Sequence, residues 1–165
     1  MSMIAEYLRV TPDELAKLQA ATTSIVDYLY PEDEDEHPAE RRCDVDETWH
    51  AIHYLLNGSA WEGEPPRFNA VLGGEPIGDD DLGNGPVRFL TAEEVREVAD
   101  ALEDVPVFVL MERFDPDVLN EAEIYPESWG ADELGREDVS ARYAELAGFF
   151  RTAAHAGDAM LLYLR

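Results

Sequence analysis

The side chains best suited to chemistry lie in the segment DETWHAIHYLLNG, residues 46–58. On a helix, His50 and His53 can face the same direction because they are three positions apart, and the carboxylates of Asp46 and Glu47 precede them. Imidazole and carboxylate groups can hold a metal ion together, or can act as a general base and the group that orients it. This segment is therefore the first candidate site.

The spacing of the two histidines argues against a zinc site. The helical zinc motif HExxH has its ligands at i and i+4 and an internal general base, and HAIH has neither. The apolar stripe of the expected helix places His53 toward the core and His50 off its edge; this stripe comprises Trp49, Ile52, His53 and Leu56. We expect no metal here, and we expect His53 to be buried with one hydrogen-bond partner, which still allows it to act as a general base or to bind a ligand.

A second candidate region is the segment NEAEIYPESW, residues 120–129. It brings amide, carboxylate, phenol and indole groups together, and flat apolar side chains with polar tips orient ligands in pockets. The alternative is a connection whose aromatic residues pack into the core while its acids are solvated. We predict a pocket with the helix at 46–57 as its floor and this segment as its wall. Its ligand-binding residues are then Trp49, His53, Asn120, Glu123, Tyr125 and Trp129.

The rest of the chain lacks a motif for a cofactor or a covalent nucleophile. The segment LGGEPIGDDDLGNG, residues 72–85, has no GK[ST] ending of a phosphate-binding loop, and its acids would repel phosphate. Neither the serines nor Cys43 lies in a recognised nucleophile signature. We therefore expect no cofactor.

Charge is the strongest feature of the composition. Against 12 lysines and arginines stand 37 aspartates and glutamates, which gives a formal net charge of −25 over 165 residues. Phosphates would repel such a chain, so we expect neither nucleic acid nor a membrane surface as a partner, and any charged partner should be cationic. A need for solubility alone, or a host whose proteins are adapted to salt, would account for the acidity without any partner.

The compartment follows from the cysteine content and the hydropathy. Cys43 is the only cysteine, so no disulfide can form within the chain, and a reducing compartment is the simpler interpretation. The start MSMIAEYLRV lacks the basic leader and apolar run of a signal peptide. No apolar stretch approaches the roughly 20 residues of a spanning helix. We expect a cytoplasmic protein.

The first half of the chain predicts a strand at 4–10 and a short helix that starts at a capping box, Thr11-Pro12-Asp13-Glu14. The acidic segment PEDEDEHPAE, residues 31–40, is typical of an exposed loop. A short edge strand follows at 41–45, and then the helix at 46–57, with Asp46 as its cap. Frequent glycines and prolines predict a long ordered loop over 59–86 with one short structured segment near 68–72.

The second half predicts a strand at 87–90 and a helix that begins at a second capping box, Thr91-Ala92-Glu93-Glu94. The stretch VPVFVLMERF, residues 105–114, is ambiguous between helix and strand, and Asp115-Pro116 caps a further short helix. A long helix is expected from Asp138 to Ala156, followed by a buried strand at 159–164. We predict one compact α+β domain over residues 1–165, in which the terminal strands pair in a small sheet packed by several helices.

The sequence resembles the YfbM-like family of small bacterial proteins, whose function is unassigned. The resemblance rests on segments spread over nearly the whole chain: MSMIAEYLRV, DVDETWHAIHYLLNG, NAVLGGEPIG, LGNGPVRFLTAEEVREVADAL, NEAEIYPESW and YAELAGFFRTAAHAGDAMLLYL. It implies a compact α+β fold with a helix at 105–114, and the residues that match the family pattern are Trp49, His53, Gly58, Gly73, Asn120, Tyr125, Pro126 and Trp129. His50 stands where a relative has a carboxylate, and the PEDEDE run goes beyond the pattern.

Two functional hypotheses follow from these observations. The first is a binding protein without covalent catalysis that recognises a basic protein partner, as an acidic inhibitor of the immunity-protein kind does, or a small polar ligand. The second is a hydrolase or lyase that uses His53 as base and Glu123 as acid or orienting group. The two hypotheses differ in geometry, because the enzyme requires these two side chains to converge on an open pocket.

Overall fold

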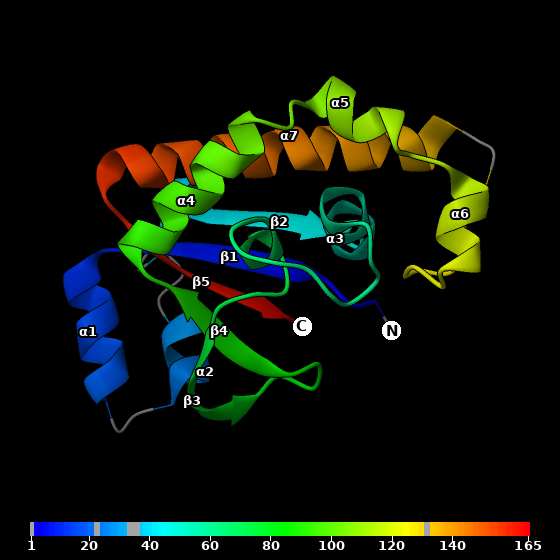
Figure 1. The fold of residues 1–165 in the computed structure, drawn as a ribbon. Coiled ribbons are helices and arrows are strands. Elements are labelled where there is room, and N and C mark those ends of the chain that lie inside the picture. Colours follow the sequence, from blue (N-terminus) through cyan, green and yellow to red (C-terminus); the bar gives the residue numbers. More distant parts are fainter. Residues whose placement is uncertain (1, 22–23, 33–36, 131–132) are drawn as a thin grey trace.

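A five-stranded antiparallel sheet forms the centre of the protein (Figure 1). The structure is a computed structural model and describes residues 2–21, 24–32, 37–130 and 133–165. The strands lie in the order β2-β1-β5-β4-β3. Their bounds are Ala5–Val10 for β1, Arg42–Asp46 for β2, Glu75–Asp81 for β3, Pro86–Leu90 for β4 and Ala159–Leu164 for β5.

The two terminal strands pair in the middle of this sheet, which confirms the predicted fold. The β1–β5 register runs from Ala5 opposite Leu164 to Val10 opposite Ala159, and β5 also pairs with β4. Beyond the strands, the backbones of Ile4 and Arg165 exchange hydrogen bonds of 2.9 Å, so both chain ends lie at the same edge of the molecule (Figure 1). The first and last elements of the chain therefore depend on each other.

Helices cover both faces of the sheet. The larger hydrophobic cluster lies on the face covered by α3 (Trp49–Asn57), α4 (Ala92–Glu103), α5 (Val107–Glu112), α6 (Pro116–Glu121) and α7 (Glu133–Ala156). A smaller cluster lies under α1 (Pro12–Ala20) and α2 (Ile25–Leu29). In Figure 1, α4, α5 and α7 lie above the sheet and α2 lies below it. Because β5 serves both clusters, nearly every one of its side chains is buried.

The capping boxes start their helices where the sequence predicts. The Thr11 hydroxyl accepts from the backbone of Glu14, whose carboxylate accepts from the Thr11 backbone, and Thr91 and Glu94 repeat this exchange for α4. Residues 107–112 of the stretch 105–114 are helical, as the family resemblance implies, and the apolar pattern alone did not decide this. Pro106 precedes the first turn of α5, where its missing N–H costs nothing.

Two helix starts differ from the prediction. Asp46 does not cap α3: it ends β2 with a φ of 52°, and the helix begins after Thr48. The long helix α7 begins at Glu133 and not at Asp138. Arg136 and Glu137, just before the predicted start, are polar and exposed, so they extend the helix without adding to the apolar period from which the start was predicted.

The loop predictions were also incomplete. The segment 59–86 contains a 3₁₀ turn at Arg67–Ala70, close to the short segment predicted near 68–72. It also contains β3, which was not predicted, because pairing with β4 supplies the order that EPIGDDD lacks in its own pattern. The helix α2 was not predicted. In the acidic segment 31–40, His37 is buried and lies 2.6 Å from the Tyr28 carbonyl, and residues 39–41 form a 3₁₀ turn; residues 33–36 lie outside the described residues.

In the described part of the chain, no helix is both long enough and apolar enough to cross a membrane.

Candidate functional site

Four aromatic rings from three segments form one contiguous cluster, which we call the ring cluster: Trp49, His50, Trp61 and Tyr125. Trp49 stacks on His50 with 4.9 Å between centroids and on Tyr125 with 5.7 Å. Trp61, from the loop after α3, lies over His50 at 4.4 Å. The cluster thus joins α3, the loop that follows it and the connection after α6.

His50 is the centre of this cluster, contrary to the expectation that it lies off the apolar edge. It is 1% exposed, because the loop after α3 and the segment around Tyr125 both fold over it. Its Nδ1 accepts from the Tyr125 N–H at 2.8 Å, and its Nε2 lies 2.8 Å from the Ala60 carbonyl. These two partners admit one state only, a neutral ring with the proton on Nε2.

The environment of His50 also favours this neutral state. Burial lowers the pKa of His50, against the opposing effects of the Ala60 carbonyl and the nearby Glu127. A second proton on Nδ1 would face the Tyr125 N–H and remove that hydrogen bond. His50 therefore acts as a structural connection between two loops, and its ring has no free nitrogen for a metal or a substrate.

The N-terminal residues close the other side of the cluster. The Trp49 indole donates to the Met3 carbonyl at 3.0 Å, and the Met3 N–H donates to the Tyr125 hydroxyl oxygen at 2.8 Å. Trp49 is thereby buried. The stacked pair of Trp49 and Tyr125 is a fixed base rather than the lining of an open cavity.

His53 is buried one turn further along α3, as expected, but it has two ring partners instead of one. Its Nδ1 accepts from the Asn57 side-chain amide at 3.3 Å, and its Nε2 lies 3.2 Å from the Glu62 carbonyl. The side chain is 0% exposed, and this burial lowers its pKa to about 4. His53 is therefore neutral at neutral pH and covered on all sides.

Asn120 and Trp129 form a separate clamp that closes the predicted wall segment. The Asn120 side chain accepts from the Trp129 N–H at 2.8 Å and donates to its carbonyl at 2.6 Å. The Trp129 indole donates to the Ile124 carbonyl at 3.0 Å, and its ring meets Phe114 edge-on. These contacts favour the core-anchoring interpretation for the end of the segment.

Glu123 lies on the surface and does not share a pocket with His53. It is exposed and adopts a φ of 56°, whereas His53 is enclosed by α3 and the following loop. Of the six predicted site residues, only Trp49 and Tyr125 touch each other in the ring cluster. The others belong to the core of α3, to the clamp or to the surface.

Trp61 is the residue that sequence reasoning missed. It is 60% exposed, which is unusual for a tryptophan, and one face of its ring rests on His50. The only signal in the sequence was a lone indole in a segment otherwise made of glycine, proline and acids. A large apolar side chain that the fold does not bury there is a candidate contact for a partner.

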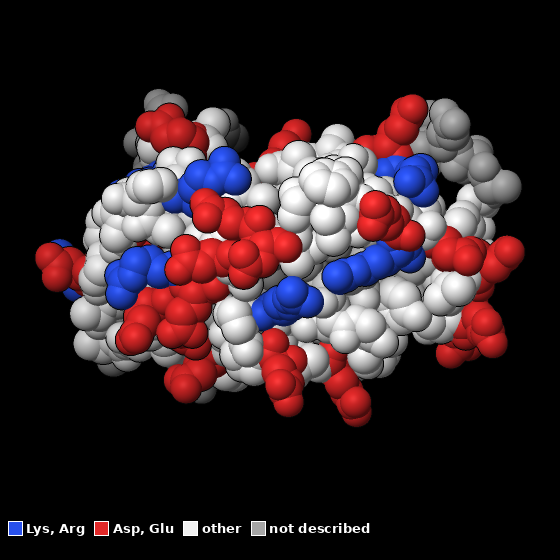
Figure 2. Space-filling view, turned by 45° about the horizontal axis from the view of Figure 1, so that its top comes forward, with Lys and Arg blue, Asp and Glu red and all other residues white. Residues whose placement is uncertain are grey.

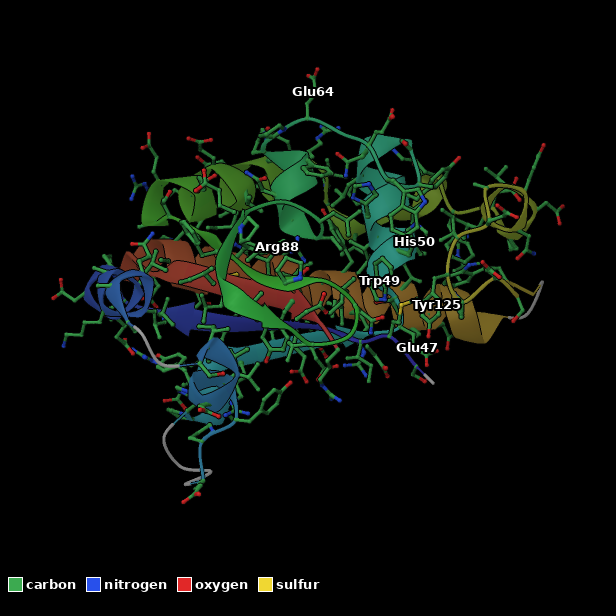
Figure 3. The ribbon with its side chains drawn as sticks, turned by 90° about the horizontal axis from the view of Figure 1, so that it is seen from below. Glu47, Trp49, His50, Glu64, Arg88 and Tyr125 are labelled. Carbon is green, nitrogen blue, oxygen red and sulfur yellow. The ribbon has the colours of Figure 1, made fainter. Side chains whose placement is uncertain are left out.

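The segments that form the ring cluster carry several exposed glutamates. Glu62 and Glu64 are exposed on the same loop as Trp61, and Glu127 is near enough to influence the pKa of His50. In Figure 3, Glu47 lies beside Trp49 and Tyr125, and Glu64 points outward from the top of the loop. Acidic side chains therefore predominate in the loop that carries Trp61 and in the segment around Tyr125.

Arg88, which is labelled in Figure 3, is engaged by the backbone that follows this loop. The Arg88 guanidinium donates to the carbonyls of Val71 and Gly73 at 3.1 and 2.6 Å, and these bonds hold it under the loop on the β4 side (Figure 3). Its positive charge supports the backbone of the following turn.

Catalytic alternatives find little support in the described residues. Burial raises the pKa of the Cys43 thiol to about 12, so it is not a thiolate nucleophile at neutral pH. Among the described residues, no group of three or more histidine, cysteine and acidic side chains is arranged to hold a metal ion.

Comparison with known proteins gives consistent matches over most of the chain. A family model described as a domain of unknown function, DUF1877, matches residues 1–163. Protein YfbM of Escherichia coli strain K12 is 29% identical over 139 residues, which covers 81% of this chain and 79% of the relative. The crystal structure of a protein of unknown function, YfbM from E. coli, superposes with a TM-score of 0.73 at 24% identity, covering 98% of this chain and 99% of that chain. The structural match supports the α+β fold.

Proposed function

Because the chain belongs to the DUF1877 family, whose function is unknown, we propose a role from the geometry of its own site. The protein is a binding protein without covalent catalysis, and its ring cluster receives a cationic side chain from a basic protein partner.

The exposed ring of Trp61 is the observation that carries this proposal. A tryptophan face attracts a guanidinium or ammonium group by about 0.5 to 2 kcal/mol, and exposed tryptophans are common binding hot spots. The ring already rests on His50, so little side-chain entropy is lost when a partner packs on its free face. The carboxylates of Glu62 and Glu64 add charge complementarity on the same loop.

Backbone strain near the cluster supports the same interpretation. Glu123 and Glu127 both have a positive φ, 56° and 69°, a region that glycine and asparagine adopt more easily. Such strain concentrates at functional sites, where a particular side chain is needed in spite of the cost. The two strained glutamates lie on either side of Tyr125, which belongs to the ring cluster.

The net charge of −25 supports a protein partner over a small ligand. A field of this size raises the rate at which a basic surface is encountered. At the cluster itself, the rings of Trp49 and His50 are covered, so a partner would contact a surface rather than enter a cavity. The competing hydrolase or lyase with His53 as base and Glu123 as its partner gains no support, because His53 is enclosed.

A peptide titration tests the proposal. The probe is a fluorescently labelled arginine-rich peptide without apolar residues, compared with the same peptide in which citrulline replaces arginine. We expect the arginine peptide to bind the native protein more tightly, and we expect Trp61→Ala to weaken its binding about tenfold, measured by fluorescence polarisation at moderate salt.

The control is Tyr30→Ala, which removes another exposed aromatic ring, 45% exposed, at a different surface. This variant should bind the arginine peptide as the native protein does. Binding that Trp61→Ala leaves unchanged would overturn the proposal, as would equal binding of the citrulline peptide.

A further inference from the structure

An open apolar groove runs between α5 and α7, away from the ring cluster residues. It encloses about 760 Å³ and is lined by Val107, Phe108, Met111, Arg136, Glu137, Ser140, Ala141 and Ala144. A second cleft of about 340 Å³ adjoins it and shares Val107 and Ala144. Together they follow α7 from Arg136 to Arg151, a length of about 22 Å at the rise of a helix.

The residue types explain why this groove remains open. The short helix α5 turns Leu110 and Met111 into the core, which leaves Phe108 on the outer side with 69% of its surface exposed. Opposite it, the part of α7 from Ser140 to Ala144 contributes only small side chains to the lining, so Phe108 stays exposed. An exposed phenylalanine beside a groove of small residues suits an apolar side chain of a partner.

The two arginines at the groove are already engaged within the protein. The Arg136 guanidinium lies 5.6 Å from the Phe114 ring centroid and donates to the Met111 carbonyl at 3.3 Å. Arg151 pairs with Glu103 at 3.5 Å. Both guanidinium groups therefore already have partners within the protein, although both side chains are exposed.

The carboxylates at the groove are free by comparison. Glu112 and Glu137 are exposed, and neither forms an ion pair with a described arginine, lysine or histidine. In Figure 2, which brings the α5 side of the molecule forward, uncharged surface lies between acidic side chains, with basic ones interspersed. The groove therefore has an apolar floor. Beside it lie two carboxylates without an ion pair among the described residues, Glu112 and Glu137, and the engaged Arg136.

We propose that this groove binds an amphipathic helix of a partner protein whose apolar stripe packs on Phe108 and whose polar face is basic. A length of about 22 Å accommodates roughly four turns of such a helix. Charge decides between this occupant and a second copy of the chain, because two molecules of charge −25 repel each other whereas a basic helix is attracted. This surface is independent of the ring cluster.

The test uses a model peptide of leucine and lysine, patterned as an amphipathic helix of about four turns. The matched control peptide has glutamate in place of lysine. Binding is measured by calorimetry, and the site is mapped from amide shift changes in NMR spectra. We expect the lysine peptide to bind with shifts centred on α5 and α7, and we expect Phe108→Ser to weaken it about tenfold, since one buried aromatic anchor is lost.

Trp61→Ala separates this proposal from the proposed function, because binding at the groove should stay within about twofold in that variant. Loss of binding in Trp61→Ala but not in Phe108→Ser would overturn the groove proposal. Comparable binding of the glutamate peptide would overturn the basic occupant. A dimer in light scattering that Phe108→Ser abolishes would identify a second copy as the occupant and would also overturn it.

Discussion

At the scale of single residues, the two histidines of α3 show how burial changes the meaning of a pair of side chains that could do chemistry. Each has one ring nitrogen that accepts from an amide group and one that faces a backbone carbonyl. That arrangement holds both rings neutral and leaves no lone pair for a metal or a proton transfer. What resembles a catalytic pair in the sequence is, in the folded protein, a pair of connections between α3 and the loops around it.

His50→Ala should lower the free energy of unfolding by about 2 to 4 kcal/mol. The change removes a buried ring and leaves both the Tyr125 N–H and the Ala60 carbonyl without partners. Urea unfolding measures the loss. Trp61→Ala is the matched control. The ring that it removes is exposed, so this variant should lower the free energy of unfolding by less than about 1 kcal/mol. Equal, small losses in both variants would contradict the central position of His50.

His53 should make stability depend on pH. Its pKa is 6.5 in the unfolded chain and about 4 in the folded protein, because burial disfavours the charged ring. Between these values the unfolded state binds the proton and the folded state does not, so the free energy of unfolding falls as the pH falls. From about pH 7 to about pH 5, the contribution of His53 lowers the free energy of unfolding by about 2 kcal/mol.

The pH effect is isolated by comparing the native protein with His53→Gln in urea unfolding at each pH. Protonation of the many carboxylates acts on both proteins alike, so the difference between the two reports the histidine. Measurements down to about pH 5 also stay above the isoelectric point of 4.2, where association is expected. A difference that does not change with pH would show that His53 is not shielded from solvent.

At the scale of elements, β5 is the central strand that joins β1 and β2 to β4 and β3. It hydrogen-bonds to β1 on one side and β4 on the other, and its side chains enter both hydrophobic clusters. The pairing joins residues at opposite ends of the chain, so the N-terminal strand has no central partner until the last residues are present.

Removal of residues 160–165 should therefore abolish cooperative unfolding, observed by circular dichroism. Because a truncated protein can aggregate before it is measured, Leu162→Ala provides a second test. The Leu162 side chain is 1% exposed, so its truncation should lower the free energy of unfolding by about 2 to 5 kcal/mol, measured by urea unfolding. Leu164→Ala, at a partly buried position of the same strand, should cost less. Undiminished thermal stability of the truncated protein would contradict this role of β5.

At the scale of the whole molecule, acidity is a cost to folding as well as a means of attraction. A net charge of −25 opposes compaction, since folding brings like charges together. Some of the acidic side chains form ion pairs within the protein. Arg142 contacts the carboxylates of Asp44, Asp46, Asp138 and Glu145, which ties β2 to α7.

The midpoint of thermal unfolding should therefore rise with salt. Raising sodium chloride from about 10 mM to about 500 mM shortens the Debye length from about 30 Å to a few ångströms and screens the repulsion. We expect an increase of several degrees in scanning calorimetry. A midpoint that falls with salt would show that ion pairs such as those of Arg142 outweigh the general repulsion.

Much of the fold could be predicted from the sequence because it depends on local patterns. The capping boxes at Thr11 and Thr91, the stripe of α4 and the apolar terminal strand each act within a few residues, so they could be identified without knowing the partners. The strand β3 and the helix α2 could not be identified in this way. The order of β3 comes from pairing with β4, and α2 is only five residues long, so its stability comes from packing in the smaller cluster.

The same distinction between local patterns and long-range packing applies to the candidate site. The sequence by itself determined that the protein is strongly acidic and that Trp49 and His53 face the core. Only the tertiary structure decided that His50 is enclosed, that His53 and Glu123 lie apart, and that Trp61 and Phe108 are exposed. The physical reason is that the exposure of a side chain depends on which distant segments fold over it. The residue pattern along one helix or loop does not indicate which segments those are.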